Sequence, residues 1–199
     1  QVTFSYPEQP RPALENVNIT INSGEKVAII GRIGSGKSTL AKLLIRLYEP
    51  TSGSVLMDGF DINQLDPADL RHNVAYVAQD AKLYFGTLRD NITFGLNGIT
   101  DQQVVDAAEQ AGILELVNSH PLGFEMPVGE RGETLSGGQR SAIAMARVFL
   151  RKPRVLVMDE PTSAMDQGTE ERLTQQIKTR FSDSTLLIIT HKMSMLTLV

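Results

Sequence analysis

Short apolar runs recur along the chain, and each is followed by a polar or glycine-rich segment. Four of them have the continuous apolar character of strands that are buried on both faces, as in a parallel sheet. We therefore expect parallel strands at residues 27–30, 74–78, 155–158 and 186–189. Apolar and polar residues alternate at residues 17–21 instead, which predicts a half-buried strand that pairs antiparallel with a peripheral strand at 2–6. A further short strand is expected at 55–57.

Apolar residues with helical spacing lie between these strands. Two stripes show the i, i+3, i+4, i+7 pattern of an amphipathic helix. They consist of Leu40, Leu43, Leu44 and Leu47, and of Ala142, Met145, Ala146, Phe149 and Leu150. Asp66 and Pro67 predict the start of a short helix, Thr100 and Gln103 form a capping box, and another helix is expected at 169–180.

Residues 31–38, Gly-Arg-Ile-Gly-Ser-Gly-Lys-Ser, fit the pattern G-x-x-x-x-G-K-[ST] that surrounds nucleotide phosphates. A buried strand precedes the motif and a helix follows it. The three glycines leave room for backbone N–H groups to surround an anion. Lys37 adds a positive charge at the β and γ phosphates, and the Ser38 hydroxyl is placed to bind Mg²⁺. A purely structural glycine-rich turn is the alternative, and the strand, the helix and the Lys-Ser pair together disfavour it.

The chain is therefore predicted to have an α/β fold with a P-loop NTPase core, a mainly parallel sheet and peripheral antiparallel strands. Residues 80–140 differ from the rest, because short helical patterns and loops rich in Gly, Asn and Pro replace the strand signals. We interpret them as an inserted α-helical lobe. The core of this single domain then consists of residues 1–79 and 141–199.

Composition excludes several classes of function. The net charge is −4 and no dense Lys/Arg run is present, which argues against a nucleic-acid partner. No cysteine is present, and the three histidines do not have the spacing of a zinc site. The longest apolar runs fall far short of the roughly 20 residues that cross a bilayer. Because the chain begins at Gln1 and stops after an apolar strand, we expect it to be part of a longer protein.

A second helix start has the composition of an anion site. Residues 135–139, Leu-Ser-Gly-Gly-Gln, contain a capping box between Ser136 and Gln139 and precede the second apolar stripe. Glycines and free N–H groups in the first turn of a helix favour an anion there. On its own this would be an ordinary N-cap. Beside a phosphate loop, it suggests that both helix starts face one triphosphate.

Polar side chains follow three of the predicted parallel strands. Asp159 and Glu160 end one strand, Gln79 follows another, and His191 follows the last. Ligands of open parallel sheets bind at the carboxyl ends of the strands. Asp159 is suited to hold Mg²⁺, and Glu160 to orient or deprotonate a water. A solvated turn is the alternative for the two acids, and a lone Gln or His in such a place is more often structural.

Tyr6 allows two interpretations from the residues alone. It lies at the end of the first predicted strand, where a core aromatic is the commoner role. It is also an aromatic ring that could stack on a base.

Together these motifs resemble the nucleotide-binding domain of ABC transporters, especially exporters, over nearly the whole chain. The most specific part is Leu-Ser-Gly-Gly-Gln at 135–139, which lies between the phosphate loop and the acids at 159 and 160. The resemblance implies catalytic roles for Glu160, His191 and Gln79, and Mg²⁺ ligands at Ser38, Gln79 and Asp159. It implies that ATP is bound by Tyr6, Gly31, Arg32, Ile33, Gly34, Ser35, Gly36, Lys37, Ser38 and Thr39, and in trans by Ser136, Gly137, Gly138 and Gln139.

The resemblance also implies partners and a location. Two copies form a head-to-tail homodimer across ATP, and residues 163–166 cross its interface. A transmembrane domain, expected upstream, places the chain at the cytoplasmic face of the inner membrane. Residues 85–92 and 128–132 resemble the exporter loops that touch this domain. Because Glu160 is present, the resemblance implies an active ATPase.

Residues 31–34 further resemble type I secretion ATPases, which export RTX proteins or adhesins with adaptor and outer-membrane partners. Ser141 and Met165 depart from the commoner family residues, which leaves the subfamily open. Export of lipids, drugs or peptides is the alternative within the family. A soluble ABC-type ATPase acting on DNA or ribosomes is the alternative outside it, and the DNA-associated form is disfavoured by the absence of heptads between the two motifs.

Overall fold

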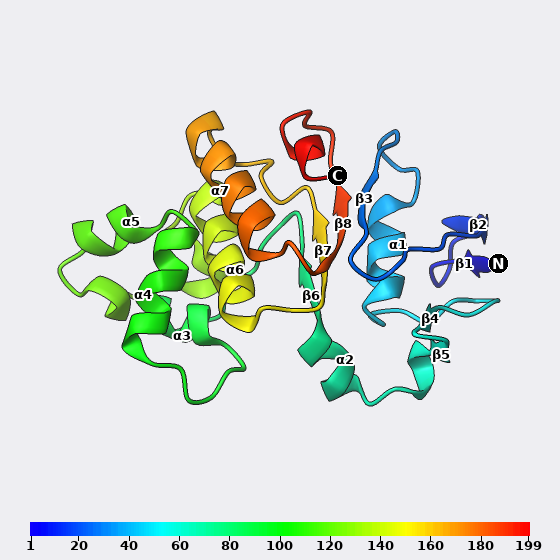
Figure 1. Cartoon of the computed structure of the whole chain (residues 1–199), viewed down its shortest axis with the longest axis horizontal. Coiled ribbons are helices and arrows are strands. Elements are labelled where there is room, and N and C mark those ends of the chain that lie inside the picture. The colour runs from blue at the N-terminus through cyan, green and yellow to red at the C-terminus, as the bar shows by residue number, and fades with distance from the viewer.

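A four-stranded parallel sheet lies at the centre of the molecule (Figure 1). The computed structural model describes all 199 residues. The strand order is β3-β8-β7-β6, and every neighbouring pair is parallel. These strands are β3 (Lys26–Ile29), β8 (Thr185–Ile189), β7 (Val155–Asp159) and β6 (Val74–Val77). All four predicted parallel strands are therefore confirmed, with bounds that differ by one residue at some ends.

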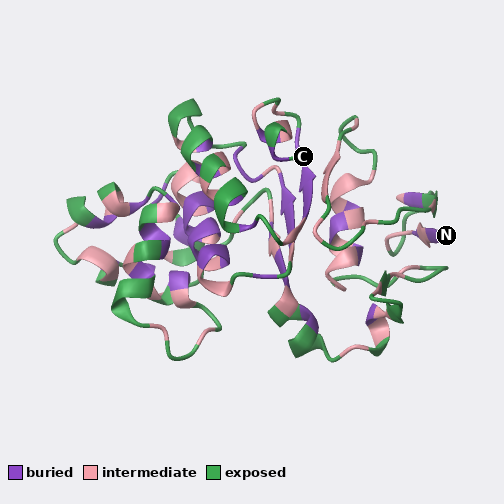
Figure 2. Cartoon of the chain, viewed as in Figure 1, coloured by how far each residue is buried: buried purple, intermediate pink, exposed green.

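Both faces of the sheet are covered, which explains the unbroken apolar runs. Leu156 and Met158 point into one cluster with helices α6 (Gly137–Arg151) and α7 (Gln167–Arg180), whereas Val157 points into another with α1 (Lys37–Leu44). Leu186 to Ile189 alternate between the two clusters in the same way. Figure 2 shows buried residues concentrated in the central strands and in α6. The predicted mainly parallel sheet is confirmed, and helices cover both of its sides.

Short helices gather beyond α6, on the side of the molecule away from the N-terminus (Figure 1). They are α3 (Leu88–Thr93), α4 (Asp101–Gln110) and α5 (Leu114–Ser119), with 3₁₀ turns at Gly123–Glu125 and Glu130–Gly132. The predicted capping box at Thr100 and Gln103 begins α4. Because one apolar cluster runs from the sheet through α6 to these helices, the division of the chain at residues 80 and 140 stays a prediction.

The N-terminal strands differ from the prediction. Strand β1 (Val2–Phe4) pairs antiparallel with β2 (Leu14–Val17), so the second strand ends where the predicted one begins. Val2, Phe4 and Leu14 bury their side chains together, and β1 is too short to pair with residues beyond Val17. Ile19 is consequently 55% exposed. The prediction of a strand at 17–21 was wrong, because alternation without a pairing partner does not form a strand.

Helix α1 ends earlier than its apolar stripe predicted. Arg46 has a φ of 54°, and the N–H groups of Arg46 and Leu47 donate to Leu43 and Lys42 carbonyls. This is the hydrogen-bond pattern that closes a helix with a left-handed residue. Leu47 is 59% exposed, so its inclusion in the apolar stripe was wrong.

The remaining elements are short. A hairpin of β4 (Leu56–Met57) and β5 (Phe60–Asp61) is followed by a 3₁₀ turn at Ile62–Gln64 and by α2 (Pro67–Asn73), which begins at the predicted Asp66 cap. A last 3₁₀ turn covers Met195–Leu198. No helix combines the length and the apolar character that crossing a bilayer requires.

Candidate nucleotide-binding site

The loop between β3 and α1 has the backbone conformation of an anion site. Gly36 is the N-cap of α1 with a φ of 88°, and Gly34 has a φ of 80°. Only glycine adopts such angles without strain. A Cβ on Gly36 would also lie 2.5 Å from the Ala13 carbonyl oxygen. Gly31 has no positive φ, but a Cβ there would lie 3.0 Å from Ser35 Oγ. The absence of a side chain at Gly31 therefore leaves room for Ser35, and the backbone angle does not require glycine.

Lys37 lies over this loop. Its Nζ donates to the carbonyl oxygens of Gly31 at 2.8 Å and Arg32 at 2.9 Å. The ammonium is thereby placed among the loop residues that the sequence predicted to bind phosphate. Ser38, the next residue, is half-buried in the first turn of α1. The remaining loop residues, including Ile33 at 94% exposure, face solvent.

Tyr6 packs beside the same helix. Its ring meets Phe4 and Tyr48 edge-on, with centroid distances of 4.9 Å and 5.3 Å. Its hydroxyl and Thr39 Oγ1 are hydrogen-bonded at 3.1 Å. Because the ring is only partly buried, it combines a packing role with an accessible face, and its stacking on a base stays a prediction.

Asp159 is the last residue of β7, and its side chain is almost fully buried at 3% exposure. The only side-chain hydrogen bond it accepts comes from the Tyr76 hydroxyl, at a long 3.4 Å. Burial raises the pKa of Tyr76 above its usual range, and the Asp159 carboxylate raises it further. A buried carboxylate with one weak partner is costly unless a cation or reactant uses it.

Glu160 and His191 meet at the ends of neighbouring strands. The Glu160 Oε1 and His191 Nε2 atoms are 3.2 Å apart, and Oε1 is buried without a hydrogen bond of good geometry. The Glu160 N–H donates to the Ile189 carbonyl at 2.8 Å, and its φ of 47° turns the chain away from the strand. The Glu160 side chain is 13% exposed, and that of His191 is 49% exposed.

Strand register brings the predicted residues to one edge of the sheet. Val77, Met158 and Ile188 are paired neighbours in β6, β7 and β8. Gln79 and Glu160 each follow by two residues and His191 by three, so they leave the same carboxyl edge. Gln79 lies exposed in the loop after β6. The expectation that these side chains share an edge is confirmed, while their roles stay predictions.

The second helix start is built as predicted. Gln139 N–H donates to Ser136 Oγ at 3.2 Å, and Ser136 N–H donates to Gln139 Oε1 at 2.8 Å. A Cβ on Gly138 would lie 2.8 Å from the Ala164 carbonyl oxygen, and one on Gly137 would lie 2.9 Å from Ala164 Cβ. The helix start and residues 163–166 therefore form one continuous surface.

The two helix starts belong to opposite faces of the sheet. Helix α1 packs on the face that contains Val157, and α6 packs on the face that contains Leu156. The last turn of α6 lies at the amino edge of the sheet, because β7 begins just after it. The first turn of α6 therefore lies toward the carboxyl edge. The first turn of α1 lies at the same edge, because α1 follows the carboxyl end of β3. One chain thus presents, at the same edge, the two helix starts that the sequence predicted to bind anions.

A cavity of about 520 Å³ lies elsewhere. Its lining includes Val74, Val155 and Thr185, which are the first residues of three parallel strands. It is therefore at the opposite edge of the sheet and contains none of the predicted site residues. Chemistry rather than cavity size identifies the candidate site in this molecule.

Sequence reasoning missed a clamp between α6 and α3. The Arg147 guanidinium donates to the Asn91 carbonyl oxygen and, at 2.8 Å, to Asn91 Oδ1. It lies 5.5 Å from the centroid of Tyr84, whose ring stacks on Phe94 at 4.1 Å. Burial lowers the pKa of Arg147. The available signal was Asn91, a polar residue at a buried position between Leu88 and Ile92.

Replacing Arg147 by alanine is expected to lower the free energy of unfolding by about 2–4 kcal/mol, because the Asn91 carbonyl oxygen loses the Arg147 donor and Asn91 Oδ1 keeps only the Tyr84 N–H. Urea denaturation measures the loss. Arg172→Ala, at an exposed position on α7, is the matched control and should change stability by less than about 0.5 kcal/mol. Equal effects of the two substitutions would contradict the clamp.

Comparison with known proteins agrees with this geometry. Residues 14–163 match the ABC transporter family. The chain is 43% identical over 196 residues to an ABC-type transporter of Aspergillus fumigatus, covering 97% of this chain and 15% of that protein. It is 39% identical over 196 residues to a Staphylococcus aureus ATP-binding/permease protein assigned to multidrug export, covering 98% and 34%.

A solved structure gives the same result. A bacterial Atm1-family ABC exporter with ATP bound superimposes with a TM-score of 0.93 at 36% identity, over 98% of this chain and 34% of that one. The chain thus spans about a third or less of the length of these relatives. The chain belongs to the ABC transporter family, as an ATPase domain of that family.

Proposed function

We propose that the chain is the ATP-driven motor of an ABC exporter, in which two copies close on ATP and hydrolysis separates them. The Glu160–His191 contact of 3.2 Å at the carboxyl edge of the sheet carries this proposal. It places a carboxylate and an imidazole at the carboxyl ends of β7 and β8, and β8 pairs with β3, the strand that leads into the phosphate loop. Such a pair can orient a water molecule and accept its proton.

The phosphate loop binds the triphosphate of ATP through its backbone. Gly34 and Gly36 hold the left-handed conformations that this loop needs, and the positive end of the α1 dipole points toward the anion. Lys37 exchanges its two loop carbonyls for β and γ phosphate oxygens. The Thr39 hydroxyl, in the first turn of α1, is hydrogen-bonded to the Tyr6 hydroxyl and so links the helix start to Tyr6. The Tyr6 ring stacks on the adenine.

The residues at this edge fit Mg²⁺. Asp159 has a buried carboxylate with a single weak partner, and Ser38 and Gln79 add a hydroxyl and an amide oxygen, the hard donors that Mg²⁺ prefers. When bound, Mg²⁺ neutralises charge on the phosphates.

Glu160 acts on the attacking water, and His191 holds Glu160 in place and contacts the γ-phosphate. The side chain of Glu160 is shielded from solvent, whereas that of His191 is half exposed. His191 can therefore turn toward the nucleotide while remaining near the carboxylate. This division of roles matches proton transfer by a positioned carboxylate and stabilisation of developing charge by a nearby donor.

A second copy supplies the other half of the site. The helix start at 136–139 and the loop at 163–166 form one surface, and they lie on the far side of the edge from the phosphate loop. In a head-to-tail pair with twofold symmetry, the surface of each copy covers the phosphate loop of the other. Two ATP molecules then lie between the copies.

The substrate is proposed to be a small molecule rather than a secreted protein. The relative assigned to multidrug export supports this choice. Type I secretion, with its adaptor and outer-membrane partners, has no support among these relatives. The one observation that favours type I secretion is the resemblance of residues 31–34 to the ATPases of that group. A transmembrane domain of the same protein or of a partner would hold the chain at the cytoplasmic face of the membrane.

Mixed dimers of the complete protein test the proposal. Lys37→Met disables a phosphate loop, and Ser136→Arg blocks the approach of the second helix start. Placed in different copies, the two substitutions leave one composite site intact. Placed in one copy, they damage both sites. We expect up to about half of the wild-type ATPase rate in the first pair and below roughly 5% in the second.

Two differently tagged copies, purified through both tags, allow this measurement. Homodimers of each single variant are the controls and should both be inactive. The reverse order of rates, with activity kept when both substitutions lie in one copy and lost when they lie in different copies, would show that the site is not shared between copies. Absence of ATP hydrolysis by the wild-type protein would refute the motor itself.

A further inference from the structure

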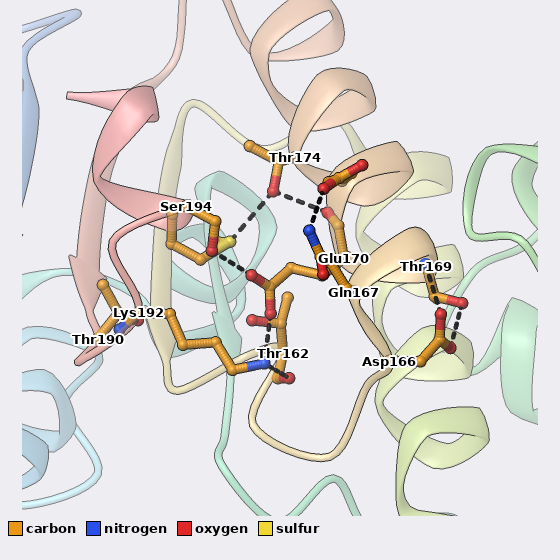
Figure 3. A network of polar contacts seen from close by, with 11 residues as sticks. Thr162, Asp166, Gln167, Thr169, Glu170, Thr174, Thr190, Lys192 and Ser194 are labelled. Carbon is orange, nitrogen blue, oxygen red and sulfur yellow. Dashed lines mark hydrogen bonds and ion pairs between the residues drawn. The ribbon is translucent and has the colours of Figure 1, made fainter.

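Glu170 is a buried carboxylate that has no part in the proposed hydrolysis of ATP. It lies in the first turn of α7 and is 5% exposed. Its Oε2 accepts a hydrogen bond from Lys192 Nζ, and its Oε1 accepts one from Ser194 Oγ (Figure 3). Both donors belong to the segment that follows β8. A charged group at a buried position of a helix needs such partners.

Lys192 extends this contact to the segment that follows β7. Its Nζ also donates to the Thr162 carbonyl oxygen at 2.7 Å, and its N–H donates to Thr190 Oγ1 at 3.0 Å. Figure 3 shows the end of the Lys192 side chain beside both Thr162 and Glu170. The ammonium therefore joins α7 and the two loops that leave β7 and β8.

These two loops carry Glu160 and His191. Lys192 is the neighbour of His191, and Thr162 follows Glu160 by two residues. The 3.2 Å distance between the Glu160 and His191 side chains depends on how far apart the loops are held. The backbone hydrogen bond from Glu160 to Ile189 holds the two loops together only where they leave β7 and β8.

The position of Glu160 needs support from its surroundings. Its φ of 47° lies in the left-handed region, which residues with a Cβ adopt at a cost. Strained backbone of this kind persists only where neighbouring contacts determine it. The bond from Lys192 to Thr162 is such a contact, because it anchors the loop just beyond the strained residue.

The anchor itself is firmly held. Asp166 caps α7 by accepting hydrogen bonds from Thr169 N at 3.0 Å and Thr169 Oγ1 at 2.7 Å. Thr174 Oγ1 donates to the Glu170 carbonyl at 2.8 Å. Burial alone would raise the pKa of Glu170, but hydrogen bonds from Lys192, Ser194 and Thr162 outweigh it and lower the pKa. Glu170 is consequently ionised and attracts the ammonium near neutral pH.

We propose that Glu170 and Lys192 are positioning residues that set the distance between Glu160 and His191. The inference rests on the proposed ATPase function and deepens it. Neither residue belongs to the proposed nucleotide site. They act through the two loops, and the ammonium of Lys192 is the element that joins them.

The test compares Lys192→Met and Glu170→Gln in the complete protein, using steady-state ATP hydrolysis and a fluorescent ATP analogue for binding. Both variants are expected to lose about tenfold or more in kcat, as misplaced catalytic groups do. KM and the affinity for the analogue should stay within about twofold of wild type. Lys192→Arg keeps a cation and is expected to retain most of the activity. Lys178→Met is the matched control, because Lys178 is exposed on α7, the helix that carries Glu170. Its kcat should equal that of the wild type.

A double-mutant comparison separates positioning from general stability. In a His191→Ala background, Lys192→Met should lower kcat by less than about twofold, because the pair that Lys192 positions is already broken. An unchanged kcat in both single variants, or a full additional loss in the His191→Ala background, would overturn the inference. If Lys192→Met does not fold, Glu170→Gln is compared with His191→Ala in the same way. Failure of the wild-type protein to hydrolyse ATP would instead refute the proposed function.

Discussion

Glu160→Gln is expected to lower the rate of ATP hydrolysis by about 100-fold or more while ATP binding is retained. Glutamine has nearly the size of glutamate, so the buried position beside His191 stays filled. It cannot accept a proton from the attacking water. The phosphate loop is separate from this residue, and its backbone conformation does not depend on the Glu160 side chain. Steady-state hydrolysis and equilibrium ATP binding, measured on the same preparation, test both parts.

Glu171→Gln is the matched control, because Glu171 is exposed on α7 and its side chain accepts a hydrogen bond from Gln167 rather than from a predicted site residue. Its hydrolysis rate should equal that of the wild type. A rate near wild type in Glu160→Gln would remove the proposed role of Glu160. Loss of ATP binding in that variant would mean that Glu160 shapes the nucleotide site rather than the reaction.

Local patterns were sufficient to predict the sheet and the site edge. The four apolar runs became the parallel strands because residues such as Leu156 and Val157 are buried on opposite faces. The rule that ligands bind at carboxyl strand ends then placed Asp159, Glu160 and His191 together, more than 100 residues after the phosphate loop. Both capping boxes, at Thr100 and Ser136, were also confirmed, since each depends on residues only three apart.

Patterns failed where the outcome depended on distant partners. Leu47 fits the stripe of α1, but the left-handed Arg46, whose side chain donates to the Leu65 carbonyl at 2.9 Å, ends the helix first. Ile19 fits a strand that has nothing to pair with. These contacts depend on tertiary structure, so neighbouring residues in the sequence cannot reveal them.

The supporting charges were missed for the same reason. Glu170 interacts with Lys192 and Arg147 with Asn91, and each pair is separated by more than 20 residues. One signal was present in the sequence. Glu170 shares a helical stripe with Leu173 and Ile177, both buried, and a charged residue on an apolar stripe indicates a buried partner.

Gly36→Ala is expected to weaken ATP binding by about 100-fold or more, because two unfavourable effects coincide at this position. The left-handed conformation costs a residue with a Cβ about 1–2 kcal/mol. The new methyl group would also lie 2.5 Å from the Ala13 carbonyl oxygen and 2.7 Å from Leu14 Cδ2. Since a backbone oxygen cannot rotate away as a flexible side chain can, the loop or the strand must move. Either movement displaces the N–H groups that surround the phosphates.

Gly34→Ala separates the two effects. Gly34 has a similar φ of 80°, but no atom lies within 4 Å of the position of a Cβ. Its substitution adds conformational strain alone, so ATP affinity should fall by no more than about 5- to 30-fold. Gly59→Ala, with a φ of 83° and open space at a turn outside the site, should lower stability to a similar degree and leave ATP affinity unchanged. Equal losses of affinity in Gly36→Ala and Gly34→Ala would show that the contact with Ala13 does not shape the phosphate loop.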